Sequence, residues 1–205
     1  TVNKKSKKQE ILEAALNLFS VQGYEATSIS QIADAVGIKK ASMYSHFSGK
    51  QEILDTMLQS GFEEYNKRSI FSKDIINSLN LKNENIATNS IIQMIIGQVK
   101  YIIHDPYISK SRKMLTIEQF RNSKLKDLLT KQNYTDVMDF FIKLVRFLID
   151  EKIIMSDNIE ITAAQLCLPI TTLIGLCDRE PEREAEIIKL IENHIRQFLK
   201  IYKPI

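Results

Sequence analysis

The sequence predicts an all-helical protein with a small N-terminal part and a larger C-terminal part. Apolar residues recur at spacings of three and four along nearly the whole chain of 205 residues, which is the pattern of amphipathic helices. No stretch alternates apolar and polar residues for long enough to predict a strand. Serine, glycine and proline residues stand where these helices should begin or end. We expect nine or ten helices and no sheet.

The first fifty residues predict three short helices around a small core. Gly23 and Gly37 stand where the first and second helices should stop. Ser28, with Gln31 three residues later, makes a capping box that begins the second helix. The apolar residues expected in this core are Leu16, Phe19, Ile32, Val36, Ile38, Met43 and Phe47.

Longer helices are expected in the rest of the chain. One begins near Lys50, and a proline after Asp105 separates two others because proline cannot continue a helix. Pro181 suits the first turn of the last helix, where its missing N–H has no partner to lose. The expected ranges are 86–104, 107–120, 124–151, 159–177 and 181–202, with a short helix or loop over 72–85.

Composition bounds the class of protein. A content of 44% hydrophobic and 26% charged residues excludes a wholly disordered or collagen-like chain. Two cysteines provide no disulfide framework, so we expect a reduced, cytoplasmic setting. The N-terminus lacks the pattern of a secretory signal, and the longest charge-free run, 161–177, is short and polar for a bilayer-spanning helix. We therefore expect no membrane partner.

The positive charge is concentrated at the N-terminal end. The net charge is +3, and residues 1–50 hold seven lysines against four acidic residues, a difference that equals the whole excess. A basic module on a neutral body indicates a nucleic-acid partner. The lysines at 4, 5, 7 and 8 fit either a solvated arm or a non-specific contact to DNA.

The third short helix has a small polar face. Because Met43 and Phe47 are expected to point inward, Ala41, Ser42 and Ser45 lie on roughly the opposite side. Short side chains allow close approach to base edges in the major groove, and longer basic or hydroxyl groups around them reach phosphates. The residues that border this face are Lys39, Lys40, Tyr44, His46 and Lys50.

This segment resembles the helix-turn-helix of the tetracycline-repressor-like (TetR) family. The similarity covers 32–50, IADAVGIKKASMYSHFSGK, and extends upstream through 11–19 and 23–24 and downstream through 52–54. The resemblance implies a homodimeric transcriptional regulator, usually a repressor, that a small ligand releases from a double-stranded DNA operator.

The resemblance also implies roles for single residues. Ser28 matches a helix cap that touches phosphate, Tyr44 and His46 match phosphate contacts, and Lys50 matches the lysine that starts the fourth helix. Lys39 departs from the pattern, in which serine or a similar cap is common. Ordinary surface packing is the alternative for Tyr44 and His46. The implied DNA-binding residues are Thr27, Ser28, Lys39, Lys40, Ala41, Ser42, Tyr44, Ser45, His46 and Lys50.

Dimerisation is expected from the last two helices. The segments 118–122, 168–170 and 177–182 resemble one branch of the family, in which these helices form a four-helix interface between subunits. Their apolar faces are wide for the core of one monomer, although a plain monomeric core is the alternative. The residues expected in the interface are Leu166, Ile170, Leu173, Ile174, Ile191, Ile195 and Phe198.

A mixed pocket for a small-molecule effector is expected in the C-terminal part. Its candidates are polar or aromatic residues on otherwise apolar helices, and ordinary core or surface positions are the alternative for each. They are Met94, Gln98, Tyr101, Glu118, Tyr134, Phe141 and Thr171.

An enzyme is not expected. The three histidines are dispersed, Cys167 and Cys177 stand ten residues apart on one predicted helix, and no phosphate loop or nucleophile motif occurs. We expect no metal and no cofactor. The predicted division is a DNA-binding domain over 1–50 and a ligand-binding and dimerisation domain over 51–205. The alternative function is a helical sensor or scaffold that acts through a protein partner without specific DNA binding.

Overall fold

The computed structural model describes residues 5–68 and 75–204 of the chain. Within these ranges every regular element is a helix, which confirms the predicted fold class. The chain packs as two compact units. The first unit runs to Lys67 and also takes in Pro106–Leu129, and the second holds Arg68–Asp105 and Thr130–Ile205. The boundary expected at residue 50 follows the predicted functions, whereas by packing the first unit extends well beyond that residue.

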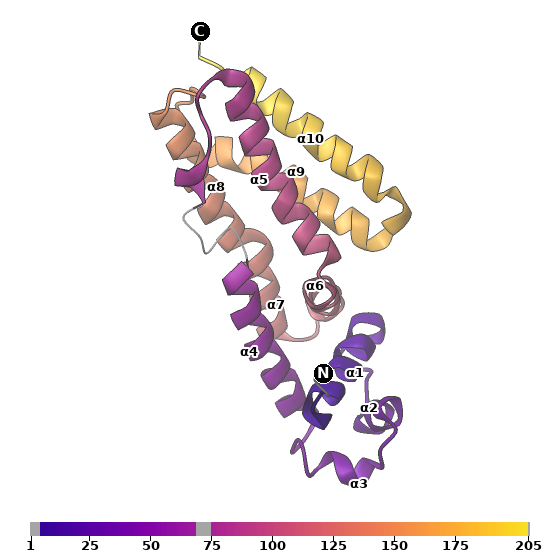
Figure 1. Cartoon of the computed structure of the whole chain (residues 1–205). Coiled ribbons are helices and arrows are strands. Elements are labelled where there is room, and N and C mark those ends of the chain that lie inside the picture. The colour runs from indigo at the N-terminus through magenta and orange to yellow at the C-terminus, as the bar shows by residue number, and fades with distance from the viewer. Residues whose placement is uncertain (1–4, 69–74, 205) are drawn as a thin grey trace. The chain divides into compact units, whose positions relative to one another are not determined.

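Helices α1 to α4, α6 and α7 build the first unit (Figure 1). Ser6 and Ser28 begin α1 and α2 with complete capping boxes, in which each side chain accepts from the backbone N–H three residues later. Gly23 and Gly37 follow these helices with positive φ, as the sequence predicts. The bounds are α1 Lys7–Gln22, α2 Ile29–Val36, α3 Lys40–Met43, α4 Lys50–Arg68, α6 Pro106–Glu118 and α7 Ser123–Thr130.

One apolar core joins these helices. Ile11, Phe19, Ile32 and Met43 are buried together with Met114 of α6, so α6 completes a core that the first three helices begin. Burial of such side chains contributes roughly 1.5–3 kcal/mol each to folding. Polar links add to it: Lys110 Nζ donates to Asn17 Oδ1 at 2.5 Å, and Lys124 Nζ lies 2.6 Å from Asp55 Oδ1.

A second apolar core lies among α5, α8, α9 and α10 (Figure 1). Asn83 and Asn158 cap α5 and α9 by accepting from the N–H three residues later. Buried residues of all four helices, such as Ile95, Leu144, Leu166 and Ile195, belong to this core. The bounds are α5 Glu84–His104, α8 Asp136–Asp150, α9 Ile159–Arg179 and α10 Glu184–Ile201, with short helical segments η2 Ile76–Ser78, η3 Lys131–Thr135 and η4 Pro181–Arg183.

The structure corrects one predicted helix and resolves part of another segment. The expected single helix over 124–151 consists of α7 and α8 with one π-helical segment, η3, between them. Periodicity does not reveal such a segment, because a single wide turn shifts the apolar pattern by only one residue. Of the expected helix or loop over 72–85, residues 72–74 lie outside the described residues, and η2 provides a short 3-10 helix.

Two helices, α5 and α9, are long and apolar enough to cross a membrane, with mean hydropathy 1.2 and 1.6 over their best windows. Length and composition do not separate a spanning helix from a core helix of a globular unit. Both helices contribute to the apolar core of the second unit, for example through Ile92, Val99, Ala163 and Ile170. This core buries 44% of the apolar window of α5 and 33% of that of α9.

Replacement by alanine should change the free energy of unfolding in opposite directions at Gly37 and Gly97. Gly37 has φ +71° with nothing near its Cβ position, so Gly37→Ala should cost about 1 kcal/mol of unfolding free energy through backbone strain alone. Gly97 lies inside α5 with open space around it, so Gly97→Ala should stabilise by about 0.5–1 kcal/mol. Urea denaturation measures both, and a change of the same sign in the two variants would contradict these backbone conformations.

Candidate nucleic-acid interface

The candidate interface rests on the junction of α2 and α3. Gly37 adopts the left-handed conformation with φ 71° and ψ 34°, and its N–H donates to Ala33 O and Asp34 O. The N–H of Ile38 also donates to Ala33 O, at 3.0 Å. These bonds satisfy the carbonyls at the end of α2 and reverse the chain into α3. The reversal is the tight turn that the sequence predicts.

Burial on one side of α3 fixes what the other side exposes. Met43 and Phe47 are buried in the core of the first unit, as predicted from their spacing. Past Met43 the chain continues in turns, with the N–H of His46 and of Phe47 both donating to Met43 O. The opposite side is exposed and forms what we term the recognition face, made of Lys39, Lys40, Ala41, Ser42, Tyr44 and Ser45.

The recognition face combines small and charged groups. Tyr44 is 54% exposed, and Ser45 Oγ donates to Ser42 O at 2.8 Å, which fixes that hydroxyl along the turn. Lys39 occupies the N-cap position of α3 without a side-chain capping bond, because an ammonium has no acceptor for a backbone N–H. His46 is half-buried at the edge of the face.

The charge of the first unit is localised further by ion pairs. Lys5 pairs with Glu13 at 2.7 Å and Lys7 pairs with Glu10, both within or next to α1. Lys39 and Lys40 make no ion pair among the residues that the structure describes. The ammonium groups of Lys39 and Lys40 therefore add positive charge to the recognition face that no described carboxylate pairs with.

The resemblance implies that Lys50 contacts DNA, but in the structure its ammonium bonds to the backbone of the first unit. Its Nζ donates to Tyr24 O at 2.7 Å and to Glu25 O at 3.2 Å, and lies 4.2 Å from the centre of the Tyr24 ring. An ammonium with two carbonyl acceptors and a cation–π contact has few donors left for phosphate. Lys50 therefore ties the start of α4 to the turn between α1 and α2.

Thr27 is also placed differently from the expectation. It is 1% exposed, its Oγ1 donates to Gly23 O at 2.7 Å, and the same oxygen accepts from Gln22 Nε2 at 3.0 Å. A buried hydroxyl with both roles used does not reach a ligand. Its neighbour Ser28 is exposed, and although Oγ accepts from Gln31 N, the hydroxyl hydrogen remains to be donated.

The turn over residues 23–28, which we term the α1–α2 turn, is closely packed. Tyr24 stacks edge-to-face on Phe19 with ring centres 5.3 Å apart, and its hydroxyl donates to Gln51 Oε1 at 3.0 Å. Burial raises the pKa of Tyr24, and the nearby carboxylates of Glu25, Asp55 and Glu118 raise it further. The phenol thus remains a neutral donor at ordinary pH.

The start of α4 is held by hydrogen bonds between Glu52 and Ser48. Glu52 Oε2 accepts from Ser48 N at 2.6 Å and from Ser48 Oγ at 2.8 Å. These hydrogen bonds, backbone first, lower the pKa of the Glu52 carboxyl. An ionised carboxylate at a helix N-terminus also interacts favourably with the helix dipole. The cap fixes the direction in which α4 leaves the recognition face.

Glu118 is the residue whose placement sequence reasoning missed. It was expected in an effector pocket, but it lies in the first unit, where its Oε1 accepts from the backbone N–H of Glu25 at 3.2 Å. Its side chain is fully buried. No local sequence signal predicts this contact, because the two residues are 93 positions apart.

The other effector-pocket candidates belong to the second unit. Met94, Gln98 and Phe141 are buried, and Tyr101 is half-buried on the same helix as the first two. Tyr134 is exposed in η3. The remaining candidate is Thr171 of α9, whose Oγ1 donates to Leu168 O at 2.9 Å.

The residues expected in a dimer interface are used differently. All but Leu173, which is half-buried, are buried in the core of the second unit within one protomer: Leu166, Ile170, Ile174, Ile191, Ile195 and Phe198. A side chain without accessible surface cannot be covered by a partner, so these residues are core residues. Apolar spacing identifies a buried face but does not say whether the same chain or a second copy buries it.

Exposed apolar residues remain on both terminal helices. On α9, Ile161 and Leu168 are seven positions apart and share one side, and on α10, Leu190 and Ile201 share another.

A metal site is a separate question. Among the described residues, no group of three or more His, Cys, Asp or Glu side chains could hold a metal ion.

Residues 11–57, which span α1 to α3 and the start of α4, match the family of bacterial regulatory proteins described as the tetR family. IcaR of Staphylococcus aureus, a negative transcriptional regulator of the biofilm operon icaADBC, is 34% identical over 84 residues, or 41% of this chain and 39% of the relative. IcaR of Staphylococcus epidermidis is 27% identical over 128 residues, which are 62% of this chain and 64% of the relative. The chain thus matches about two fifths of the length of the first relative.

Solved structures share the fold over nearly the whole chain. MexZ, a repressor responsible for antibiotic resistance in Pseudomonas aeruginosa, superposes with TM-score 0.69 at 17% identity and covers 97% of this chain and 95% of its own. SmeT, the repressor of the Stenotrophomonas maltophilia multidrug efflux pump SmeDEF, gives TM-score 0.62 at 16% identity, covering 97% and 91%. At these identities the likeness concerns the fold alone. With the helix-turn-helix geometry described above, the N-terminal segment over residues 11–57 belongs to the tetR family of bacterial regulatory proteins.

Proposed function

We propose that the chain is a ligand-responsive, DNA-binding transcriptional repressor that binds a near-palindromic operator as a homodimer and is released by a small molecule. The observation that carries the proposal is the recognition face, an exposed surface of small polar side chains and two unpaired lysines over a buried Met43 and Phe47. The S. aureus relative is itself named a negative transcriptional regulator.

The groups on the recognition face suit the major groove. Ala41 and Ser42 allow the backbone of α3 to approach base edges, where a hydroxyl can donate or accept and a methyl group contacts thymine. Lys39, Lys40 and Tyr44 border them and reach phosphate oxygens, which set register and supply most of the salt-dependent affinity. The face therefore divides into a reading part and a positioning part.

Dimerisation through α9 and α10 uses their exposed apolar residues. Ile161, Leu168, Leu190 and Ile201 remain exposed after the core of one protomer is complete. Apolar side chains gathered on two terminal helices favour a symmetric contact with a second copy, because the contact removes them from water. Two copies would present two recognition faces to the two halves of an operator.

The second unit is proposed to hold the effector. Met94, Gln98 and Phe141 are buried there, and Gln98 provides a polar group among apolar neighbours. An effector lowers operator affinity only by the difference between its binding to the DNA-competent and the DNA-incompetent states. Tighter operator binding in the presence of the effector would reverse the proposed sign of regulation.

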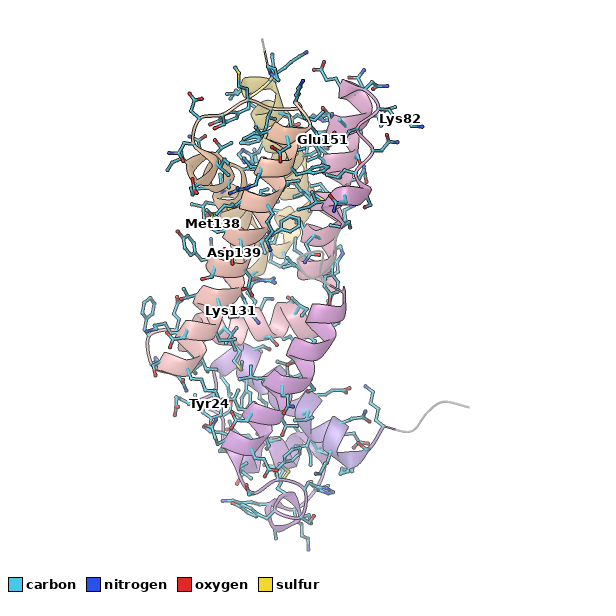
Figure 2. All side chains as sticks on the ribbon, turned by 90° about the vertical axis from the view of Figure 1, so that its left-hand side faces the viewer. Tyr24, Lys82, Lys131, Met138, Asp139 and Glu151 are labelled. Atoms are coloured by element: carbon cyan, nitrogen blue, oxygen red, sulfur yellow. The ribbon has the colours of Figure 1, made fainter. Side chains whose placement is uncertain are left out.

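Loss of a lysine from the recognition face should weaken DNA binding through electrostatics. In a dimer, Lys39→Ala or Lys40→Ala should reduce the slope of log affinity against log salt by about two, since each protomer loses about one phosphate contact. Lys82→Ala is the control, because Lys82 is exposed in the second unit, where its side chain extends away from the helices (Figure 2).

The measurement is titration of DNA from upstream of the chain's own gene at several salt concentrations, with Ser42→Ala as a third variant. Ser42→Ala should reduce discrimination between this DNA and unrelated DNA while leaving the salt slope unchanged, because it removes a base contact and no charge. Equal slopes for wild type, Lys39→Ala and Lys40→Ala would sink the proposed orientation of α3 on DNA.

Charge placed on the exposed apolar residues should dissociate the dimer. Leu168→Glu and Leu190→Glu should shift the species at micromolar concentration from dimer to monomer in analytical ultracentrifugation, with helix content retained. Val21→Glu is the matched control, since Val21 is an exposed apolar residue of the first unit. Ile191→Ala should act differently and lower stability by about 2–5 kcal/mol, because Ile191 fills the core. A dimer unaffected by either glutamate would contradict the proposed face.

A further inference from the structure

We propose that Glu118 is a positioning residue for DNA binding: from the last position of α6 its carboxylate holds the α1–α2 turn in the place that orients α2 and α3. The inference rests on the proposed DNA-binding function and adds to it a residue outside the helix-turn-helix. Glu118 lies well outside residues 11–57, the segment that matches the tetR family.

Burial makes a merely space-filling role costly for this side chain. Glu118 has no exposed surface, its Oε1 accepts from Glu25 N, and its Oε2 accepts no hydrogen bond from the described residues. Taking a carboxylate out of water with so few donors is unfavourable, and an apolar residue of similar size would fill the space at lower cost. The group that the position requires is an acceptor for the Glu25 amide.

The backbone opposite Glu118 is shaped to admit the carboxylate. Gly23 has φ +87°, and a Cβ on it would lie 2.4 Å from Glu118 Oε1 and 2.9 Å from Ile117 Cγ2. Any side chain at position 23 would therefore displace the end of α6. The end of α1 and the end of α6 meet here in direct contact.

The same turn is held from α4 with the opposite polarity. The Lys50 ammonium donates to the carbonyls of Tyr24 and Glu25, while the Glu118 carboxylate accepts from the N–H of Glu25. Cation on carbonyl and anion on N–H both follow the direction of the peptide dipoles. The turn is thereby fixed between α4 and α6.

The fixed turn leads directly into the DNA-reading elements. Two residues after Glu25, Thr27 bonds back to Gly23 O, and Ser28 then caps α2. The chain from the Glu118 contact to the first residue of α2, Ile29, is therefore only four residues long and bonded at each step. Loss of the contact should loosen the orientation of α2 and α3 without removing any group that touches DNA.

The test compares variants that keep or lose the acceptor. Glu118→Gln keeps an acceptor oxygen at the same reach, Glu118→Leu keeps the volume without the acceptor, and Glu118→Asp keeps the charge but shortens the reach. Asp127→Asn is the control, because it removes one exposed carboxylate from the same unit. Two readouts are measured on the full chain: hydrogen exchange of the Glu25 amide by NMR, and affinity for upstream DNA and for unrelated DNA.

Glu118→Leu and Glu118→Asp should each speed exchange of the Glu25 amide and weaken binding to upstream DNA by about ten-fold, the scale of one backbone donor left without an acceptor, with binding to unrelated DNA unchanged. Glu118→Gln and Asp127→Asn should stay within about two-fold of wild type on both readouts. Should the leucine variant not fold, the aspartate variant carries the same comparison.

Two results would overturn the assignment of Glu118. One is a Glu25 amide that stays as protected in the leucine and aspartate variants as in wild type. The other is faster exchange with no loss of affinity for upstream DNA. Failure of the wild-type chain to bind upstream DNA would instead overturn the proposed function, while the exchange measurement would still report whether Glu118 holds the turn.

Discussion

The presentation of the recognition face depends on how the α1–α2 turn is held. The turn contains few residues, and side chains from three other elements bond to it: Lys50 of α4, Glu118 of α6 and Gln22 of α1. These hydrogen bonds are partly buried, and together they hold the turn in the arrangement described. Because α2 starts at its end, the direction of α2 and then of α3 follows from that arrangement.

The four-residue spacing of Met43 and Phe47 determines both what enters the core of the first unit and what the recognition face exposes. Met43 and Phe47 enter a core completed by Met114 and Leu115 of α6, so the opposite side of α3 and the turn after it, with Ala41, Ser42 and Ser45, faces solvent. Ion pairs along α1 neutralise Lys5 and Lys7 and leave the charge of Lys39 and Lys40 uncompensated. Two of the lysines that give residues 1–50 their excess positive charge thereby lie on the recognition face.

Local patterns predicted most of the fold. Capping boxes at Ser28, glycines at helix ends and apolar periodicity are short-range features, and the structure confirms the α2–α3 turn and the inward positions of Met43 and Phe47. Lys50 and Glu118 could not be placed in this way, since their acceptor and donor lie 26 and 93 residues away in the chain. The sequence shows a lysine beside the DNA-reading helix, but it does not show whether the ammonium is free to contact phosphate or is bonded to the protein, as that of Lys50 is.

For α9 and α10, the sequence did not show which apolar residues pack within one chain and which remain exposed. Helix α9 is apolar on most sides, so its pattern does not separate the face that meets α8 and α10 from a face that meets a second copy. The structure assigns Leu166 and Ile170 to the core and leaves Ile161 and Leu168 exposed. The same difficulty applies to α5, in which the buried Gln98 lies among apolar residues.

DNase I footprinting of the full chain on the DNA upstream of its own gene tests the central claim most directly. Two recognition faces held by a symmetric dimer predict a protected region with two similar half-sites in inverted orientation, their centres about one helical turn, or roughly 34–36 Å, apart or a multiple of it. A protected region with a single unrepeated half-site, or no protection at low salt, would contradict a dimeric helix-turn-helix regulator.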